Sequence, residues 1–336
     1  MPTETTTRRL SLLRPAATSG RVETFAEEVR RGLTGRPKTL PCRYFYDEEG
    51  SRLFERICEL PEYYLTRAED EILRDHAAEM VDGWMKAPAL VELGSGSSTK
   101  TRRLIAAALA RYGSLHYLPI DVSPTILEAS AETLVEDFEG LRVTGVVADY
   151  RDALGSLARK VRGPKLVVFL GSSLGNYEPD EAVALLAHVA RCMHPGDRLL
   201  LGVDLAKGRD VLEAAYDDAQ GVSAAFNKNI LTRINADLDA DFDLDAFGHR
   251  ATYREDRGRV EMHLVSCRDQ SVGIGGLDAS IRFAQGETIH TENSHKYTGD
   301  QLDDLSSRAG FVERSSWVDA AHRFKVQLWE PQPRTD

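Results

Sequence analysis

The feature that most constrains the fold of this chain is a regular alternation of apolar segments and helical patterns between residues 66 and 205. Strands are expected at Ala89–Leu93, Leu115–Ile120, Val143–Val147, Lys165–Leu170 and Arg198–Val203, and helices at about Thr99–Arg111, Pro124–Phe138, Arg151–Lys160 and Pro179–Met193. Strands that are apolar throughout have to be buried on both faces, and a helix between successive strands provides the crossover that parallel pairing needs. The sequence therefore predicts an α/β protein with a doubly wound, mostly parallel sheet.

Two helices and an N-terminal arm are expected before the first of these strands. Thr66 and Glu69 have the spacing of a capping box, so a helix should begin there and continue to about Met80. Another helical pattern covers about Val22–Leu33, and residues 1–20, which are rich in Thr, Ser and Arg, are interpreted as a flexible N-terminal arm.

The pattern changes after Leu205. Helices at about Asp210–Asp217 and Val222–Leu238 are followed by two-fold alternation at His249–Arg254, Val260–Cys267 and Leu277–Phe283. A helix at Asp300–Gly310 and strands at Phe311–Val318 and Phe324–Trp329 then return to the first sheet as an antiparallel edge. We therefore expect a first domain from residues 67–205 plus 297–336, and a second, α+β substrate-binding domain from residues 21–66 plus 206–296. A ligand is expected between the two.

The charge and the cysteine pattern argue against several classes of binding partner. The 336 residues carry a formal net charge of −11 without a basic stripe, which argues against nucleic acid as a partner. No apolar run approaches the ~20 residues that span a bilayer, so no membrane partner is expected. The cysteines form no C-x-x-C pair and no H-E-x-x-H occurs, so no metal is predicted and a reducing, cytoplasmic compartment is expected. A monomer that binds a small molecule fits these properties.

Three consecutive expected strands end in residues suited to a nucleoside. Gly94 and Gly96 follow the first strand, where glycines let the backbone approach a ligand closely. Asp121 ends the second, where an acid suits ribose hydroxyls. After the third strand, Asp149 is suited to an adenine amino group and Tyr150 to packing on the ring.

The glycine loop distinguishes between two kinds of cofactor. A dinucleotide favours a third glycine at the position that Thr99 occupies here. S-adenosylmethionine has no pyrophosphate and does not need that glycine. The loop and the acid after the second strand are similar to the class I methyltransferase pattern, which favours S-adenosylmethionine as the methyl donor. A dinucleotide-dependent oxidoreductase is the alternative from another class.

Five dispersed segments then resemble the histidine-specific Nα-methyltransferases of ergothioneine biosynthesis. They are LPEYYLTR at 60–67, VFLGSSLGN at 168–176, AAYDDAQGV at 214–222, VEM at 260–262 and TENS at 291–294. The resemblance covers roughly residues 22–330, nearly the whole chain. It implies S-adenosylmethionine-dependent trimethylation of the α-amine of free L-histidine to hercynine, the first step of ergothioneine biosynthesis.

The resemblance also implies roles for single residues. Tyr63, Asn176 and Tyr216 would hold the polar end of the amino acid, while Glu292 and Ser294 would hold the imidazole. The remaining substrate contacts would be Gly171, Met262 and Asn293, and Tyr46 would be the candidate catalytic residue. The matching cofactor positions are Gly94, Gly96, Lys100, Asp121, Asp149 and Tyr150. Asn293 stands where the family usually has an apolar residue.

The chemistry of these side chains agrees with the resemblance. A carboxylate at Glu292 can accept from an imidazole N–H, and the Ser294 hydroxyl can serve the other ring nitrogen. If the segment is extended, both side chains fall on one face. The nearest alternative is a related Nα-methyltransferase acting on tryptophan or a thiolated histidine, although an indole has only one polar atom. A catalytically inactive binding protein is a further alternative.

Overall fold

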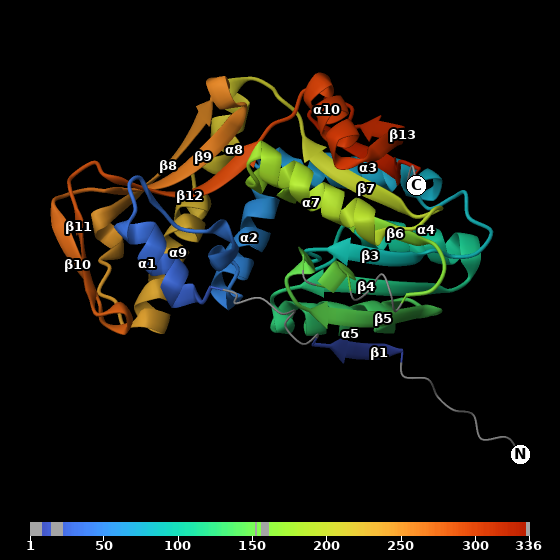
Figure 1. The fold of residues 1–336 in the computed structure, drawn as a ribbon, viewed down its shortest axis with the longest axis horizontal. Helices are drawn as coiled ribbons and strands as arrows, with labels where there is room; N and C mark the ends of the chain where they lie inside the picture. The colour runs from blue at the N-terminus through green and yellow to red at the C-terminus, as the bar shows by residue number, and fades with distance from the viewer. Residues whose placement is uncertain (1–8, 15–22, 152, 156–160, 334–336) are drawn as a thin grey trace, which may run out of the picture.

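The computed structural model describes residues 9–14, 23–151, 153–155 and 161–333. Its larger lobe contains an eight-stranded sheet in the order β1-β5-β4-β3-β6-β7-β14-β13 (Figure 1). These strands are β1 (Leu10–Leu13), β3 (Ala89–Leu93), β4 (Leu115–Asp121), β5 (Leu141–Val147), β6 (Lys165–Phe169), β7 (Arg198–Asp204), β13 (Phe311–Val318) and β14 (Phe324–Pro331). Strands β1, β5, β4, β3, β6 and β7 run parallel to one another, and β14 and β13 form an antiparallel edge. The predicted doubly wound α/β sheet is confirmed.

The strand order reverses at β3, which pairs with β4 on one side and β6 on the other. Every residue of β3 and β6 is buried, as expected for strands covered on both faces. In sheets of this kind, ligands bind beyond the carboxyl ends of the strands at the reversal point. The topology therefore places a ligand site at the ends of β3, β4 and β6.

The prediction of a flexible arm at residues 1–20 is wrong for Leu10–Leu13, which forms strand β1. It pairs in parallel with β5, with Leu10 opposite Val143, and Leu12 packs closely over Gly145. An edge strand exposes unpaired backbone groups, and β1 covers those of β5. Four residues are too few for a periodic pattern to be recognised. Residues 1–8 and 15–20 of the expected arm lie outside the described residues.

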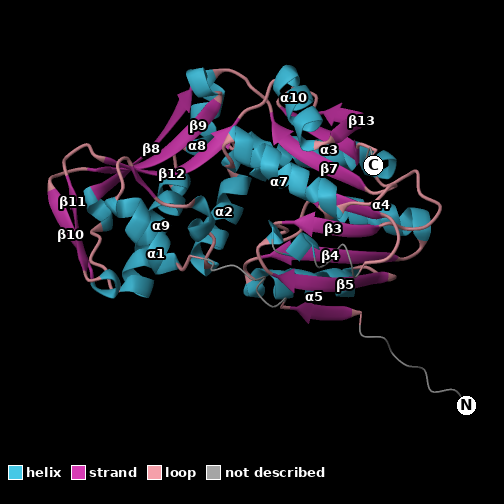
Figure 2. Cartoon of the chain, in the orientation of Figure 1, coloured by secondary structure: helices cyan, strands magenta, loops and turns pink. Residues whose placement is uncertain are grey.

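Helices cover both faces of this sheet (Figure 2). One face packs against α3 (Tyr64–Met80), α4 (Arg102–Tyr112) and α5 (Pro124–Asp137), and the other against α7 (Pro179–Cys192) and α10 (Gly299–Ala309). The helix expected at Arg151–Lys160 falls partly outside the described residues.

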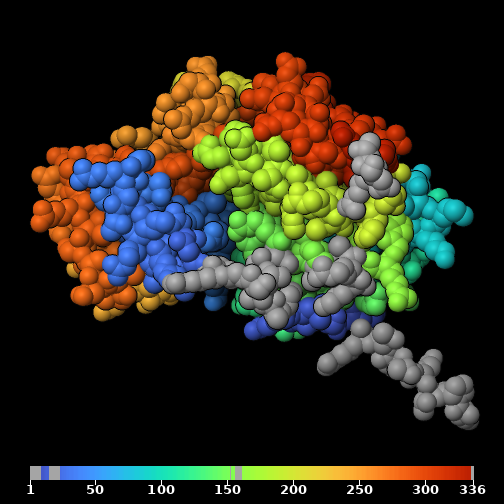
Figure 3. Space-filling model, viewed as in Figure 1, coloured from blue at the N-terminus to red at the C-terminus, as the bar shows by residue number. Residues whose placement is uncertain are grey.

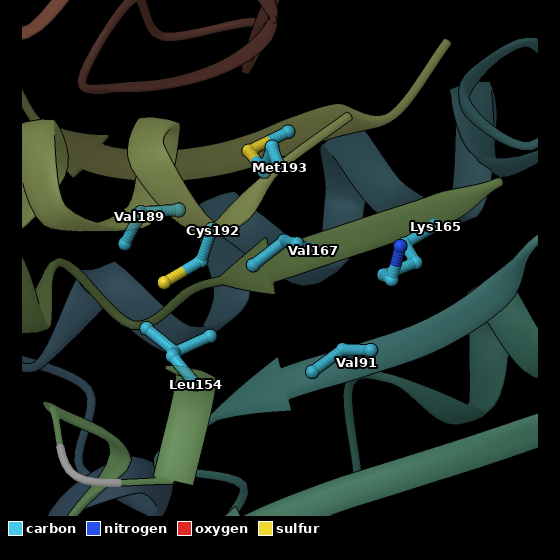
Figure 4. Close-up of a pocket in the computed structure, with 7 residues that line it drawn as sticks. All are labelled: Val91, Leu154, Lys165, Val167, Val189, Cys192 and Met193. Atoms are coloured by element: carbon cyan, nitrogen blue, oxygen red, sulfur yellow. The ribbon is translucent and has the colours of Figure 1, made fainter. Parts of the chain in front are cut away.

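The α7 face of the sheet is closely packed. Figure 4 shows Val189 and Cys192 of α7, and Met193 just after it, beside Val91 of β3 and Val167 of β6. These side chains line a cavity of about 10 Å³. Such a cavity holds about one water molecule. It offers no room for a ligand, so this packing supports the sheet.

The smaller lobe contains a four-stranded sheet in the order β2-β12-β9-β8 and a separate hairpin of β10 and β11. Its strands are β2 (Lys38–Thr39), β8 (Phe247–Arg254), β9 (Arg259–Ser266), β10 (Gln270–Ile274), β11 (Ala279–Phe283) and β12 (Thr288–His295). Its helices are α1 (Phe25–Thr34), α2 (Glu48–Glu59), α8 (Arg209–Tyr216) and α9 (Val222–Leu238), with short 3₁₀ turns η1 (Cys42–Phe45), η3 (Leu244–Ala246), η4 (Glu255–Arg257) and η5 (Gly275–Leu277). Strand β12, which was not expected as a strand, carries the TENS segment.

The two lobes lie side by side (Figure 3). One continuous hydrophobic cluster includes Ile72 of α3 from the larger lobe and Phe226 of α9 from the smaller. The expected division into residues 67–205 plus 297–336 and residues 21–66 plus 206–296 stays a prediction, because this hydrophobic cluster is continuous between the two lobes. Within the described segments, no helix combines the length and apolar character needed to cross a membrane.

Candidate active site

The glycine loop after β3 adopts the conformation expected for close approach of a ligand. Gly94 and Gly96 have φ angles of +70° and +49°, which favour glycine. The N–H groups of Gly94 and Ser95 donate to the Ile120 carbonyl of β4. A side chain at Gly96 would meet no atom within 4 Å. The loop is therefore held against β4 while one side of it stays open.

Asp121, at the end of β4, is fixed beside this loop. One carboxylate oxygen accepts from the Gly96 N–H at 2.8 Å, and the other from the Ser123 N–H at 2.9 Å. Each oxygen has a further lone pair, so the carboxylate can accept from ligand hydroxyls while it holds the loop.

Tyr150 lies next to the glycine loop. Its ring packs 5.6 Å from that of Phe169, its hydroxyl bonds to that of Tyr177, and its edge lies 4.0 Å from where a Gly94 side chain would be. Asp149 pairs with Arg151 at 3.0 Å. Burial acts in the opposite direction, but the guanidinium holds the pKa of Asp149 below its usual range. The Tyr150 ring therefore lies beside the glycine loop, and the neighbouring Asp149 is held in its charged form by Arg151.

Lys100 connects the glycine loop to the end of β6. Its ammonium forms an ion pair with Glu69 of α3, whose carboxylate is fully buried and also accepts the Gly171 N–H at 2.9 Å. Burial opposes the charged lysine, but Glu69 more than offsets this effect and raises the pKa of Lys100. Lys100 and Gly171 are therefore neighbours through Glu69, which the sequence had suggested only as a helix cap.

The predicted imidazole-binding residues lie on β12. Ser294 shares a 2.7 Å hydrogen bond with the Tyr216 hydroxyl at the end of α8. Glu292 stands opposite Met262 of β9 in the strand register, so their side chains share a face. The extended β12 also puts Glu292 and Ser294 on one face, as expected.

The Glu292 carboxylate has an unusual environment. It makes no hydrogen bond with any residue that the structure describes. Burial raises its pKa to about 7, and the charge of Lys296 acts in the opposite direction. A half-buried acceptor of this kind is suited to a ligand N–H.

Three tyrosines from different elements gather near Glu292. Tyr63 precedes α3 and lies edge-to-face with Tyr216 at 6.0 Å. Tyr46 follows η1 and contacts Phe226 edge-to-face at 5.6 Å. Burial raises the pKa of all three hydroxyls, and the Glu292 charge adds to this effect. They therefore stay protonated at neutral pH and can donate hydrogen bonds.

Asn176 ends a short 3₁₀ turn, η2 (Ser173–Asn176), that packs against β12. Gly175 makes this possible, because a side chain there would lie 2.9 Å from the His295 carbonyl oxygen. The half-buried Asn176 amide makes no hydrogen bond within the described part of the chain. It is thus free to contact a ligand near the TENS strand.

The structure does not bring the Asn293 side chain into this cluster. It bonds to His290 at 2.9 Å and to Glu178 at 3.1 Å, on the opposite face of β12 from Ser294. Strand alternation gives the reason, because side chains at successive positions point to opposite faces. The other predicted residues fall into two groups, one at the glycine loop and one at β12.

Comparison with known proteins identifies the chemistry. Residues 25–331 match the family described as histidine-specific methyltransferase, SAM-dependent. The chain belongs to this family. A histidine N-alpha-methyltransferase from Mycolicibacterium smegmatis is 41% identical over 319 residues, covering 95% of this chain and 98% of that protein. One from Mycobacterium tuberculosis is 42% identical over 301 residues, covering 90% and 93%. Ergothioneine biosynthesis protein 1 from Neurospora crassa is 30% identical over 290 residues, covering 84% of this chain and 32% of that protein.

The methyl donor of the family is S-adenosylmethionine, and the geometry of the glycine loop fits it. The open side of Gly96, the spare acceptor positions of Asp121 and the ring of Tyr150 are suited to a nucleoside. No cluster of His, Cys, Asp and Glu side chains suited to a metal ion occurs among the described residues.

Two buried charged residues beside this site, Lys296 and Asp204, were not predicted from the sequence. Lys296 follows β12 and contacts both Tyr216 and Ser294 at 2.8 Å. Asp204 ends β7 and pairs with Lys296 at 2.8 Å. Asp204 directly follows the strand predicted at Arg198–Val203, and an acid after an apolar run was the available signal.

Proposed function

We propose that this protein transfers methyl groups from S-adenosylmethionine to the α-amine of free L-histidine and produces hercynine, the first step of ergothioneine biosynthesis. The observation that carries the proposal is the side-by-side placement on β12 of the Glu292 acceptor and the Ser294–Tyr216 hydroxyl pair. An imidazole offers one N–H and one lone-pair nitrogen, which this arrangement complements. The histidine methyltransferases among its relatives point to the same substrate.

The amine end would lie among Asn176 and the tyrosines. Asn176 can bond to the carboxylate or amine of an amino acid, because its amide both donates and accepts. Tyr46 and Tyr63 lie close enough to Glu292 for its charge to affect their hydroxyls, and both rings pack edge-to-face against Phe54. The trimethylated product is a permanent cation, and aromatic rings stabilise such cations.

The residues contribute mainly positioning. The bound donor supplies a methyl group that its sulfonium already activates, so alignment of the amine is the main requirement. An α-amine with a pKa near 8 is mostly protonated at pH 7 and has to lose a proton before the first and second transfers. Because burial raises the pKa of Tyr46 and Tyr63, these hydroxyls stay protonated at neutral pH and do not act as bases. Water is the final proton acceptor in this proposal.

The test is incubation of the purified protein with S-adenosylmethionine and each standard amino acid, followed by mass spectrometry. Histidine should gain three methyl groups, and fragmentation should place them on the α-nitrogen. Preferential methylation of tryptophan would overturn the substrate assignment while leaving the family intact. The Glu292→Ala variant is the matched control for the site, because it should lose most of the histidine methylation that the native protein shows.

We also propose that the protein acts as a cytoplasmic monomer without nucleic acid or membrane partners. Both groups of predicted residues come from one chain, and none of the four cysteines forms a disulfide. Sedimentation at working concentration should show a single species of 37.3 kDa, whereas a dimer that loses activity on dilution would contradict the monomer.

A further inference from the structure

A fully buried lysine lies behind the predicted imidazole site. The Lys296 ammonium is 0% exposed, and it contacts the Tyr216 hydroxyl, the Ser294 hydroxyl and the Asp204 carboxylate, each at 2.8 Å. An ammonium has three N–H donors and no acceptor. These contacts therefore use all of its hydrogens.

This arrangement constrains the hydrogens of the Tyr216–Ser294 pair. The two hydroxyls carry one hydrogen each, and neither can donate to Lys296 because an ammonium accepts nothing. One hydrogen forms the 2.7 Å bond between them. The other has to point away from Lys296, whichever hydroxyl carries it.

We propose that Lys296 is a positioning residue that orients this free hydroxyl hydrogen toward the substrate ring. The pair then offers a donor beside the Glu292 acceptor, which selects a neutral imidazole with one N–H and one acceptor nitrogen. The inference rests on the proposed function, because it takes Ser294 and Glu292 as contacts of histidine.

The surroundings of Asp204 allow this role to be separated from folding. Its carboxylate also accepts from the Tyr64 hydroxyl at 2.7 Å and pairs with Lys207 at 2.6 Å. Asp204 therefore keeps charged and neutral partners when Lys296 is replaced. Lys207 contacts neither Tyr216 nor Ser294 among the described residues, so Lys207→Met removes an ammonium from the same carboxylate and leaves the hydroxyl pair intact.

Lys296 also affects the charge state of Glu292. The ionisable groups that face Glu292 are Cys42 and Tyr46 from the η1 region, Tyr63 before α3, Tyr216 at the end of α8, and Lys296. Among these groups only Lys296 is cationic. Removing its charge raises the pKa of Glu292 further, so the acid limb of histidine binding should move to higher pH.

The experiment compares native protein, Lys296→Met and Lys207→Met. Affinity for S-adenosylmethionine is measured by calorimetry, and kcat and KM for histidine are measured across pH. Lys296→Met should keep its cofactor affinity and show a KM for histidine raised about tenfold or more, with the acid limb shifted to higher pH. Lys207→Met should resemble the native protein in its KM for histidine and in its pH profile.

Three outcomes overturn the inference. The first is that Lys296→Met keeps the native KM for histidine and the native pH profile. The second is that Lys296→Met and Lys207→Met lose histidine activity equally. The third is that Lys296→Met weakens cofactor binding and histidine binding by the same factor. If Lys296→Met does not fold, the double variant Asp204→Asn/Lys296→Met removes both charges, and its KM for histidine should still be raised. Absence of histidine methylation by the native protein would instead refute the proposed function.

Discussion

Replacing Glu292 by glutamine should separate substrate binding from stability. Burial raises the pKa of Glu292 from 4.5 to about 7 in the folded protein. The folded state therefore holds the proton more tightly than the unfolded state does. The buried Glu292 carboxylate therefore lowers the free energy of unfolding when it is ionised. This destabilisation is absent below about pH 4.5, grows as the pH rises toward 7, and is complete above about pH 7.

The magnitude follows from the pKa difference. A shift from 4.5 to about 7 corresponds to at most about 3 kcal/mol, and partial exposure to solvent reduces this to about 1–2 kcal/mol. Glu292→Gln should therefore stabilise the ligand-free protein by that amount near pH 8 and have little effect near pH 4.5. In the complex, a neutral hydrogen bond replaces a charged one, which should lower kcat/KM for histidine roughly 5- to 30-fold.

Urea unfolding at both pH values gives the stability difference, and kcat/KM for histidine, phenylalanine and tryptophan gives the selectivity. Asn293→Ala is the matched control, because its side chain faces His290 and Glu178 on the other side of β12. It should change kcat/KM for histidine less than about threefold. A Glu292→Gln variant that is less stable near pH 8 would contradict the cost of burying the Glu292 charge, and one that keeps the full preference for histidine would contradict its role in binding the ring.

Three further predictions concern the cofactor site and the amino-acid end. Asp121→Ala removes the acceptor beside the glycine loop, so calorimetry should show S-adenosylmethionine binding weakened at least tenfold, at a cost of about 1.5–3 kcal/mol; unchanged affinity in a folded variant would remove Asp121 from the site. Asn176→Ala should weaken histidine binding and leave cofactor affinity nearly intact, whereas equal weakening of both would indicate a structural role. Glu69→Ala leaves Lys100 without its carboxylate, so urea unfolding should show a loss of about 3 kcal/mol; a loss below 1 kcal/mol would contradict the importance of this buried pair.

The parallel strands could be predicted because burial on both faces makes them apolar throughout. The expected bounds of β3 (Ala89–Leu93) and α9 (Val222–Leu238) agree with the structure to the residue. Strand β12 was missed because Thr288–His295 has polar residues on both faces, so no two-fold apolar pattern marks it. The glycine loop was recognisable because the positive φ angles at positions 94 and 96 favour glycine at both.

Long-range contacts of charged residues could not be predicted. Glu69 had the spacing of a capping partner for Thr66, but α3 begins at Tyr64, and its N-terminus has no side-chain cap. The partners of Glu69 are Lys100 and Gly171, which lie 31 and 102 residues away in the sequence. No local pattern encodes such a contact. The resemblance supplied Glu292 and Ser294, whereas the side-chain direction of Asn293 depended on the strand itself.

The most direct test of the central claim is a crystal structure with L-histidine and S-adenosylhomocysteine bound. The imidazole should lie between Glu292 and Ser294, with one ring nitrogen about 2.7–3.2 Å from each side chain. The nucleoside should lie beside Asp121 and Tyr150. An imidazole bound elsewhere, with Glu292 still lacking a hydrogen-bond partner, would exclude Glu292 and Ser294 as the imidazole site.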